Sequence, residues 1–399
     1  MRIGMLADVY KPHVSGITNY IALNKKYLEK AGHDVFIFTF GDENYPDNET
    51  NVIRSQGMPL TDTGYYLSLS YKAQARKLLY SMDIVHVHHP FVSGTLALRY
   101  CKPRGIPIVF TNHTRYDLYA QIHIPILPDI IGDTIIQAYL PQFCRSCDMV
   151  IAPSQGLRQV LLRIGVDAAM EVIPNGVDLE PFAKITRREE RSCLGYRPDQ
   201  VVLTYVGRLG PEKNLPFLVR SFAGIASAFP DVRLLLIGDG PERDNLQDLV
   251  HTMGIDEKVQ FAGLVPYEKL PTFLACADAF VTASVTEVHP LSVIEAMAAG
   301  LPVLGISSPG VGDTIVDGVT GFLASDDLAS FTAKMAHLVT DRDLCRKMGE
   351  QARQASKAYD IQLTTQCVLE RYTHLVQTSM GRKHNLRARF TRLFDNWHL

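Results

Sequence analysis

Two acidic side chains and the start of a short helix lie close together between Ser284 and Val303. Glu287 and Glu295 are eight residues apart, and we expect a helix of small residues from about Leu291 to Ala299. Its N-terminus would point back toward Glu287. Helix N-termini carry unpaired N–H groups and a positive dipole end, so they bind anions such as phosphate. Carboxylates beside an anion site suit a ligand with hydroxyls and phosphates, and a sugar nucleotide has both.

Two basic side chains follow a predicted strand in the segment Val206–Asn214, just before a helix pattern. Arg208 would bind a diphosphate as a fork and Lys213 as a point charge. Together they would offset the negative charge that develops on a leaving diphosphate, without a metal ion. The alternative is a solvated basic pair with no ligand.

Gly16 and His113 lie in turns that follow two other predicted strands. Gly16 would let the backbone approach a ligand closely, and Thr18 would cap the helix that follows. His113 follows the predicted strand Ile108–Thr111, where it can donate to a sugar hydroxyl or move a proton. The alternatives are a plain connecting loop and a histidine that serves only packing.

Two further motifs are weaker evidence of function. The segment Leu236–Glu242 resembles the start of a dinucleotide-binding fingerprint, but Arg243 stands where the third glycine is needed, which weakens an oxidoreductase interpretation. Cys144 and Cys147 are spaced like a redox or zinc pair. They have no second pair at metal spacing and lie in a run that reads as helix, so we expect a structural role.

Short apolar runs alternate with helix-length amphipathic stretches, which predicts parallel sheets covered by helices. The pattern runs twice, with a break after Ile173–Asp178. We therefore expect an α/β protein of two doubly wound, Rossmann-like domains that face a central cleft, with the ligand beyond the carboxyl ends of the strands. The expected strands are Arg2–Leu6, Asp34–Phe40, Ile84–His88, Ile108–Thr111, Met149–Ala152 and Val172–Ile173, then Val201–Val206, Arg233–Ile237, Val259–Phe261, Ala279–Thr282 and Val303–Gly305. The expected helices include Thr18–Ala31, Thr95–Cys101, Leu215–Ala228 and Arg243–Met253.

The bulk composition agrees with a globular two-domain chain. It has 399 residues, of which 46% are hydrophobic and 21% charged. A net charge of −2 argues against nucleic-acid binding. No apolar run approaches the roughly 18 residues that a membrane span needs, the first residues read as a strand rather than a signal peptide, and seven scattered cysteines fit a reducing cytoplasm.

Several of these segments together resemble the retaining glycosyltransferases of family 4, which have the GT-B fold. The segments that carry the resemblance are Ile173–Asp178, Gly207–Asn214, Gly238–Glu242 and Glu287–Val303. They occur in the family's order, and the resemblance covers residues 1 to about 365. It implies that Arg208 and Lys213 hold the donor diphosphate, that Glu295 binds the ribose and that Glu287 lies beside the transferred sugar.

The same resemblance assigns the remaining candidate residues. His113 would lie near the 6-hydroxyl of the sugar, and Gly16 would bring N–H groups to the diphosphate or the reacting centre. The loop Val288–Leu291, with His289, Pro290 and Leu291 as donor-binding residues, would offer further backbone N–H groups to the donor sugar and phosphate. Two departures from the family pattern concern these loops. Val288-His289-Pro290 replaces a Gly-Phe-Gly type of loop, with a proline that has no N–H and a histidine in place of the aromatic residue, and Ser15 replaces the first glycine of a pair.

The resemblance also implies a mechanism and a division of the chain. The sugar leaves and arrives on the same face, the leaving phosphate helps to deprotonate the acceptor, and no protein nucleophile is needed. No Asp-x-Asp motif lies at a strand end, so we expect metal-independent transfer without a cofactor. We expect an acceptor-binding domain over residues 1–174, a nucleotide-sugar-binding domain over 175–365, and a helix with a basic tail over 366–399 that returns to the first domain.

Three segments favour a membrane lipid as acceptor. Leu67–Tyr80 reads as a helix with three basic residues and no acid, and Leu118–Ile136 mixes aromatic and aliphatic residues with few charges. The tail Gly381–Leu399 carries five Lys or Arg and one acid, interleaved with apolar residues, which suits an anionic bilayer surface. The alternative for the tail is a helix with a solvated basic face. The segment Asn112–Tyr119 also resembles bacterial diacylglycerol glucosyltransferases.

These features predict a cytoplasmic enzyme, peripheral on the inner face of the cell membrane, that moves a hexose to a lipid. The expected donor is UDP-glucose and the expected acceptor is diacylglycerol or a similar lipid, with no nucleic-acid partner. Three alternatives stay open: the same chemistry on a soluble sugar, sugar phosphate or other small acceptor, a GT-B sugar-nucleotide epimerase, and a non-catalytic nucleotide-sugar-binding protein. The sequence leaves the oligomeric state open.

Overall fold

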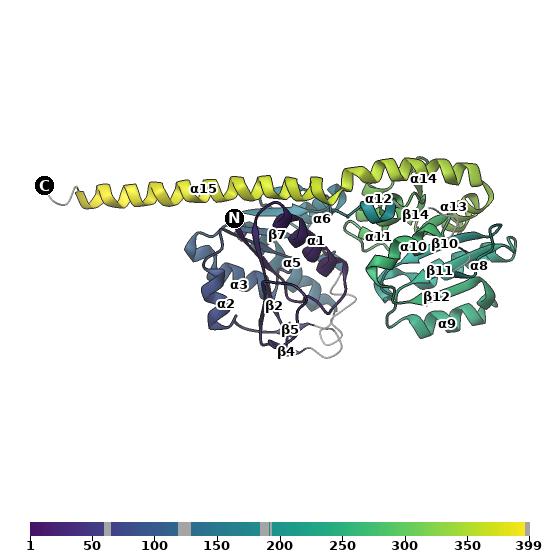
Figure 1. The fold of residues 1–399 in the computed structure, drawn as a ribbon, viewed down its shortest axis with the longest axis horizontal. Helices are drawn as coiled ribbons and strands as arrows, with labels where there is room; N and C mark the ends of the chain where they lie inside the picture. Colours follow the sequence, from purple (N-terminus) through teal and green to yellow (C-terminus); the bar gives the residue numbers. More distant parts are fainter. Residues whose placement is uncertain (60–64, 119–128, 184–190, 192–193, 396–399) are drawn as a thin grey trace.

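The protein folds into two α/β lobes joined by a pair of crossing segments (Figure 1). The structure is a computed structural model that describes residues 1–59, 65–118, 129–183, 191 and 194–395, with side chains described in these ranges except at 129–137 and 381–395. The segment Leu118–Ile136, which was expected to favour a lipid acceptor, therefore lies almost wholly outside the described side chains.

The first lobe contains a parallel sheet in the order β3-β2-β1-β6-β7-β8-β9. The order turns back beside β1, so the carboxyl ends of β1 and β6 flank a switch point, where doubly wound sheets bind ligands. Its strands are β1 (Arg2–Leu6), β2 (Asp34–Phe40), β3 (Val52–Ser55), β6 (Ile84–Val87), β7 (Ile108–Thr111), β8 (Met149–Ala152) and β9 (Met170–Val172). Its helices are α1 (Gly16–Lys30), α2 (Ala73–Leu79), α3 (Val92–Tyr100), η1 (Lys102–Arg104), α5 (Asp129–Ser146) and α6 (Gln155–Arg163).

The second lobe contains a parallel sheet in the order β12-β11-β10-β13-β14-β15, with its own switch point between β10 and β13. Its strands are β10 (Val201–Val206), β11 (Val232–Ile237), β12 (Val259–Gly263), β13 (Ala279–Thr282), β14 (Val303–Ile306) and β15 (Gly321–Ala324). Its helices are α7 (Glu180–Ala183), η3 (Pro211–Lys213), α8 (Leu215–Ala226), α9 (Arg243–Thr252), η4 (Asp256–Lys258), η5 (Tyr267–Lys269), α10 (Leu270–Ala275), α11 (Leu291–Ala298), α12 (Pro309–Thr314), α13 (Leu328–Thr340), α14 (Arg342–Ser356) and η6 (Lys357–Tyr359).

The chain crosses between the lobes twice, and the two crossings pair with each other. The N–H of Val177 donates to the carbonyl of Tyr359, and the N–H of Ile361 donates to the carbonyl of Val177. After the second crossing, α15 (Ile361–Asp395) runs back along the first lobe and past it (Figure 1). The phenol of Tyr372 on α15 is fully buried there and bonds Nδ1 of His86 on β6.

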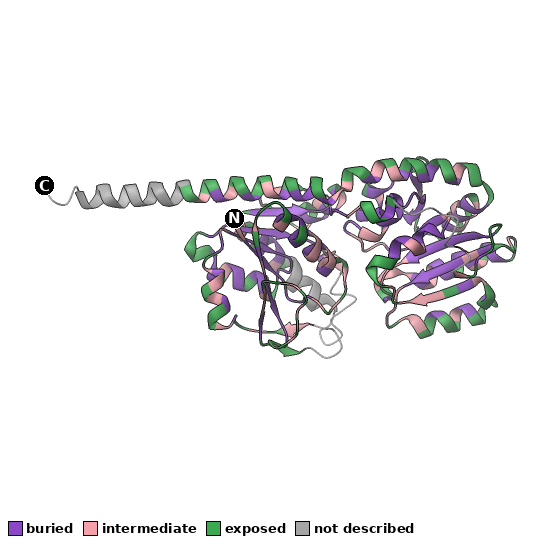
Figure 2. Cartoon of the chain, viewed as in Figure 1, coloured by how far each residue is buried: buried purple, intermediate pink, exposed green. Residues whose placement is uncertain are grey.

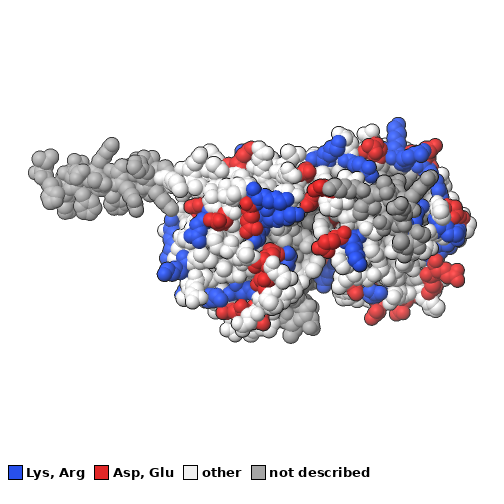
Figure 3. All heavy atoms as spheres, in the orientation of Figure 1, with Lys and Arg blue, Asp and Glu red and all other residues white. Residues whose placement is uncertain are grey.

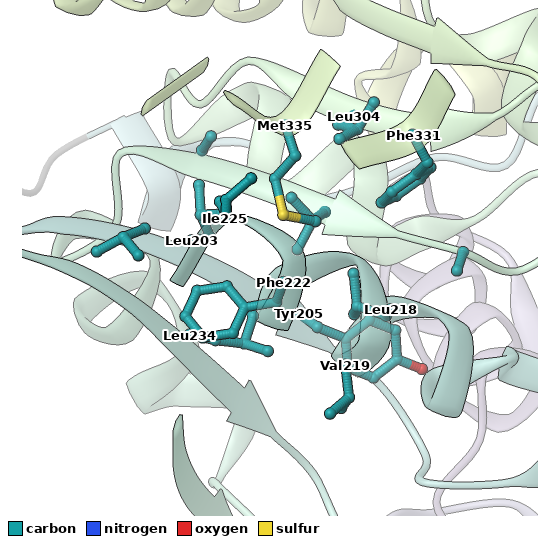
Figure 4. Packing of buried hydrophobic residues seen from close by; sticks show 14 of the residues in the cluster. Leu203, Tyr205, Leu218, Val219, Phe222, Ile225, Leu234, Leu304, Phe331 and Met335 are labelled. Atoms are coloured by element: carbon teal, nitrogen blue, oxygen red, sulfur yellow. The ribbon is translucent and has the colours of Figure 1, made fainter. Parts of the chain in front are cut away.

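Each sheet is buried between helices, as its apolar strands require. In the second lobe, Leu203 and Leu234 from the strands pack against Phe222 of α8 and against Phe331 and Met335 of α13 (Figure 4). The central strands of both sheets are almost wholly buried, whereas the edge strands β9 and β12 and the outer faces of the helices are more exposed (Figure 2). On the face shown in Figure 3, basic and acidic side chains are interspersed over both lobes, so this face carries no broad basic field.

Six of the eleven expected strands have the bounds that the sequence indicates, and four differ by one or two residues at one end. The expected strand Val172–Ile173 lies at Met170–Val172 instead. The expected helix Leu67–Tyr80 begins only at Ala73, because Leu67 pairs with Met58 in an antiparallel hairpin of β4 (Met58–Pro59) and β5 (Tyr66–Leu67). The strands β3 and β15 were not expected.

Candidate active site

The turn after β10 places Arg208 and Lys213. Gly207 has φ 155°, Asn214 has φ 53°, and the turn between them contains the single 3-10 turn η3. Asn214, in the left-handed conformation that asparagine tolerates, precedes α8, and its side-chain amide donates to the carbonyl of Ala283 after β13, 3.4 Å away. The neighbouring turns at the carboxyl ends of β10 and β13 are thereby tied together.

Lys213 and Glu287 form an ion pair across these two turns. Nζ of Lys213 lies 2.7 Å from Oε1 of Glu287, and each side chain is only about 20% exposed. Burial alone would lower the pKa of Lys213 and raise the pKa of Glu287. The attraction between the opposite charges outweighs burial, so the pKa of Lys213 is raised and that of Glu287 is lowered. Both groups are therefore charged near neutral pH.

The position of Glu287 is set by backbone contacts on two sides. The hydroxyl of Thr286 donates to the carbonyl of Glu212, 3.1 Å away. Gly310, at the start of α12, lies against the backbone of Glu287 so closely that an added Cβ would come within 2.4 Å of the carbonyl oxygen. A larger residue at position 310 would displace the acidic side chain, so glycine is required for packing here.

The partial glycine motif after β11 braces the Arg208 turn and forms no dinucleotide fingerprint. Gly238 has φ 133°, and an added Cβ would lie 1.9 Å from the carbonyl oxygen of Gly207. The N–H of Leu209 donates to the carbonyl of Asp239, and the N–H of Glu242 donates to the carbonyl of Leu209. The two turns therefore form one backbone unit. The guanidinium of Arg208 is exposed on it and is available to a ligand.

Glu295 lies on the buried face of α11, one turn into the helix. Its side chain is 5% exposed, and Oε1 accepts a hydrogen bond from the phenol of Tyr267, 3.0 Å away in η5. Burial raises the pKa of Glu295 to about 7, and the bond from Tyr267 opposes that rise. A carboxylate with one phenol partner retains acceptor capacity for the two hydroxyls of a ribose.

The loop before α11 holds the His289 ring inside the protein and begins the helix with a proline. The ring of His289 is buried against Tyr359, with ring centroids 5.0 Å apart, and burial lowers its pKa to about 4. Its carbonyl accepts a hydrogen bond from Nδ2 of Asn175 in the first crossing segment. Because Pro290 is the N-cap and has no N–H, the free N–H groups of this helix start at Leu291.

Gly16 is the first residue of α1, just after the turn that contains His13. Burial lowers the pKa of His13, and the positive charge of Arg208 in the second lobe lowers it further. Gly16 is exposed, with open space where a Cβ would be. The expected cap was wrong: Ser15 is the N-cap of α1, and Thr18 is the third helical residue of a capping box, in which each side chain accepts from the other residue's N–H.

His113 lies at the carboxyl end of β7, next to a second histidine that sequence reasoning missed. Nε2 of His113 is 3.1 Å from Nδ1 of His88, and the edge of Tyr20 packs on the His113 ring at 4.7 Å. Burial lowers the pKa of His113 well below its usual value. The strand-end rule that selected His113 also applies to His88, which ends the expected strand Ile84–His88.

The structure brings Arg208, Lys213 and Glu287 together at one switch point, with Glu295 one helical turn beyond the same loop. Gly16 lies on the first lobe at the start of α1, and the His289 ring packs inside the protein. Tyr267 was missed because nothing in its local sequence marks it as a partner of Glu295. The thiol of Cys144 is buried in α5 with its pKa raised to about 12, which keeps it protonated.

Two searches of the described residues were negative. No cluster of three or more His, Cys, Asp or Glu side chains in this part of the chain has the arrangement of a metal site. Within the same residues, no helix has both the length and the apolar character needed to cross a bilayer.

Comparison with known proteins decides the family. Residues 14–181 match the model of Glycosyltransferase Family 4, and residues 186–355 match that of Glycosyl transferases group 1. The alpha-monoglucosyldiacylglycerol synthase of Streptococcus pneumoniae is 30% identical over 332 residues, which cover 81% of this chain and 75% of that protein. The chain belongs to the family 4 glycosyltransferases. This glycosyltransferase is also 28% identical over 373 residues to the alpha-monoglucosyldiacylglycerol synthase of Acholeplasma laidlawii, covering 90% of this chain and 93% of that one.

The fold of the glycosyltransferase matches solved structures over nearly its whole length. Anabaena Alr3699/HepE in complex with UDP and glucose superimposes with a TM-score of 0.77 at 20% identity, covering 94% of this chain and all of that one. The expected GT-B class, with two Rossmann-like domains, is confirmed.

Proposed function

We propose that this glycosyltransferase moves glucose from UDP-glucose to a membrane lipid such as diacylglycerol, with retention of configuration and without a metal. Residues 175–365 bind the nucleotide sugar, and residues 1–174 bind the acceptor. The observation that carries the proposal is the Lys213–Glu287 ion pair beside the exposed Arg208, at the carboxyl ends of β10 and β13.

The ion pair fits a donor that carries both a diphosphate and a sugar. Arg208 and Lys213 supply two positive charges to a diphosphate leaving group, so charge stabilisation needs no metal ion. Glu287 holds Lys213 in place and remains ionised beside the sugar, while Glu295 accepts the ribose hydroxyls. Gly16 and the first N–H groups of α11, from Leu291, supply neutral donors to the phosphates.

Retention is supported by the names of two relatives. Two relatives are alpha-monoglucosyldiacylglycerol synthases, and an α-glucoside made from an α-linked nucleotide glucose keeps its configuration. In our proposal the leaving phosphate takes the acceptor proton, held by Arg208 and Lys213. UDP and glucose in the structurally similar Alr3699/HepE complex support the choice of donor.

The lipid acceptor is supported by the names of the same relatives and by the position of basic residues. The tail Gly381–Leu399 carries five Lys or Arg against one acid. It belongs largely to α15, which Figure 1 shows running past the first lobe. On α2, Lys77 is exposed, whereas Lys72, just before the helix, is paired with Glu43, 3.0 Å away. We propose that the tail supplies most of the attraction of the enzyme to the anionic cytoplasmic face of the membrane.

The test is a product assay on the purified full chain. The enzyme is incubated with a panel of nucleotide sugars and with vesicles of anionic phospholipid that contain diacylglycerol, and product masses are read. We expect a monohexosyl diacylglycerol from UDP-glucose, with an α anomeric signal by NMR and with activity kept in excess chelator. Products only on soluble sugars or sugar phosphates, or an epimerised nucleotide sugar, would contradict the proposal.

A further inference from the structure

Three histidines form a buried row between the first sheet and the predicted sugar position. His86 and His88 come from β6 and its end and are at most 1% exposed, whereas His113 is partly exposed after β7. The rings of His86 and His88 have centroids 4.2 Å apart, and those of His88 and His113 lie 5.3 Å apart. Burial, and the neighbouring rings, lower the pKa of His88 and His113, so both are neutral near pH 7.

Each neutral imidazole carries one N–H, so in the hydrogen bond between the two rings one histidine donates and the other accepts. That bond joins Nδ1 of His88 to Nε2 of His113 at 3.1 Å. If His113 donated, His88 would carry its N–H on Nε2. That nitrogen is buried and has no hydrogen-bond partner among the described residues. A buried N–H without an acceptor is costly and rarer than a buried acceptor without a donor, so His88 is the donor.

Hydrogen bonds to His86 and packing by Tyr20 hold the row in place, so the His88 ring has little freedom to turn. His86 bonds the phenol of Tyr372 through Nδ1, at 2.5 Å, and the hydroxyl of Thr111 through Nε2, at 2.6 Å. Tyr20 packs its edge on both His88 and His113, at 5.7 and 4.7 Å between centroids. With Nε2 of His113 bonded to His88, the nitrogen left for a ligand is Nδ1.

We propose that His88 is a positioning residue for the transfer reaction: by donating to Nε2 of His113, it fixes the His113 proton on Nδ1, where it is donated to the 6-hydroxyl of the transferred sugar. The inference rests on the proposed function, together with the expectation from the family resemblance that His113 lies near the 6-hydroxyl of the transferred sugar. It assigns His88 no contact with substrate.

The first experiment reads the tautomer of the wild-type protein directly. The full chain is labelled with ¹⁵N-histidine, and the ring nitrogens of His113 are assigned by comparison with His113→Gln. We expect a protonated Nδ1 and an unprotonated Nε2 in His113 at pH 7, and the reverse pattern in His88→Asp, whose side chain accepts only. A proton on Nε2 of wild-type His113 would overturn the proposal whatever the activity.

The second experiment separates positioning from packing. His88→Asn keeps an N–H donor near the Nδ1 position, whereas His88→Leu keeps bulk without a donor. We expect His88→Leu to lower kcat/KM for UDP-glucose by about fivefold to tenfold, as for one lost neutral hydrogen bond, and to leave kcat/KM for UDP-6-deoxyglucose unchanged. His88→Asn should restore most of the UDP-glucose activity.

Each outcome of the second experiment bears on one claim. If His88→Leu lowers kcat/KM equally for UDP-glucose and UDP-6-deoxyglucose, His88 is a packing residue and the proposal is overturned. The same holds if His88→Asn has the wild-type melting temperature but does not restore activity with UDP-glucose. Transfer from another nucleotide sugar and none from UDP-glucose by the wild-type enzyme would instead overturn the proposed function. The NMR result on wild-type His113 stands apart from both.

Discussion

The two lobes present opposite solutions to the problem of burying polar groups at a ligand site. In the second lobe, Lys213 and Glu287 are buried together and both stay charged, because each charge compensates the other. In the first lobe, His88 and His113 are buried without a counter-charge and become neutral. In our proposal the charged pair of the second lobe stabilises a diphosphate, and the neutral histidines of the first lobe donate to hydroxyl groups.

The two sites also differ in what holds them. The charged site depends on close backbone contacts between loops, with Gly238 against Gly207 and Gly310 against Glu287. The histidine row depends on side chains stacked over a sheet and bonded to Tyr372 from the far end of the chain. The following changes test this contrast, beginning with the one that should have the largest effect.

Lys213→Ala should remove the charge that defines the second-lobe site. We expect kcat to fall by roughly two to three orders of magnitude, as for loss of one preorganised transition-state partner, and the buried Glu287 to be left without its cation. The measurement is steady-state turnover at saturating donor. The matched control is Lys347→Ala on the exposed face of α14. A Lys213→Ala rate close to wild type would mean that the ion pair does not bind the diphosphate.

Gly238→Ala should show that the charged site depends on backbone contact. Its added Cβ would lie 1.9 Å from the carbonyl oxygen of Gly207, at φ 133°. We expect a loss of about 1–3 kcal/mol in the free energy of unfolding and a higher donor KM, because the Arg208 turn must move. Gly254→Ala is the control, since it has φ 65° and open space around the Cβ. An equal effect of both changes would leave only backbone strain as the cause.

Glu295→Ala should affect binding more than chemistry. Ribose contacts are the same in the ground and transition states, so the donor KM should rise by about tenfold while kcat changes little. Tyr267→Phe removes only the phenol that bonds Glu295, and it should raise KM by less. A fall in kcat at unchanged KM for Glu295→Ala would instead place this carboxylate at the sugar.

The raised pKa of Glu295 makes the stability and the donor affinity of the second lobe depend on pH. Its folded-state pKa of about 7 lies above the ordinary value of 4.5, so this group favours folding fully below pH 4.5 and loses that contribution as pH rises to about 7. We expect the melting temperature of wild type to fall relative to Glu295→Gln over this window. Donor affinity should rise through pH 7, because the ionised carboxylate is the stronger acceptor. Parallel melting curves of the two proteins would contradict the assignment.

Deletion of residues 381–399 should leave both sites intact and have the smallest effect on the donor. We expect weaker flotation with anionic vesicles and slower transfer to lipid, with donor hydrolysis unchanged. A tail in which Arg382, Lys383, Arg387, Arg389 and Arg392 become Gln loses its positive charge and tests the role of that charge at constant length. Unchanged lipid activity in both variants would show that the tail is not the anchor.

The sequence was sufficient where a local pattern determines structure. The strands β1, β2, β7, β8, β10 and β13 have the bounds that their apolar runs predict. It failed at β3, β15 and the hairpin of Met58 and Leu67, whose residues form strands only because a neighbouring strand supplies hydrogen bonds. Similarly, the residue type of Thr18 suits an N-cap, but the helix begins earlier, at Gly16, so Ser15 is the N-cap.

By itself the sequence determined the alternation of strands and helices, the turns at the strand ends and the residue types that those turns carry. These features depend on local propensity and on periodicity, which neighbouring residues set. Only the tertiary structure decided that Lys213 meets Glu287, 74 residues away, that Tyr267 bonds Glu295, and that His88 bonds His113. Such contacts depend on how sheets and loops pack, and so do the charge states of the groups, because burial and the partner's charge set the pKa.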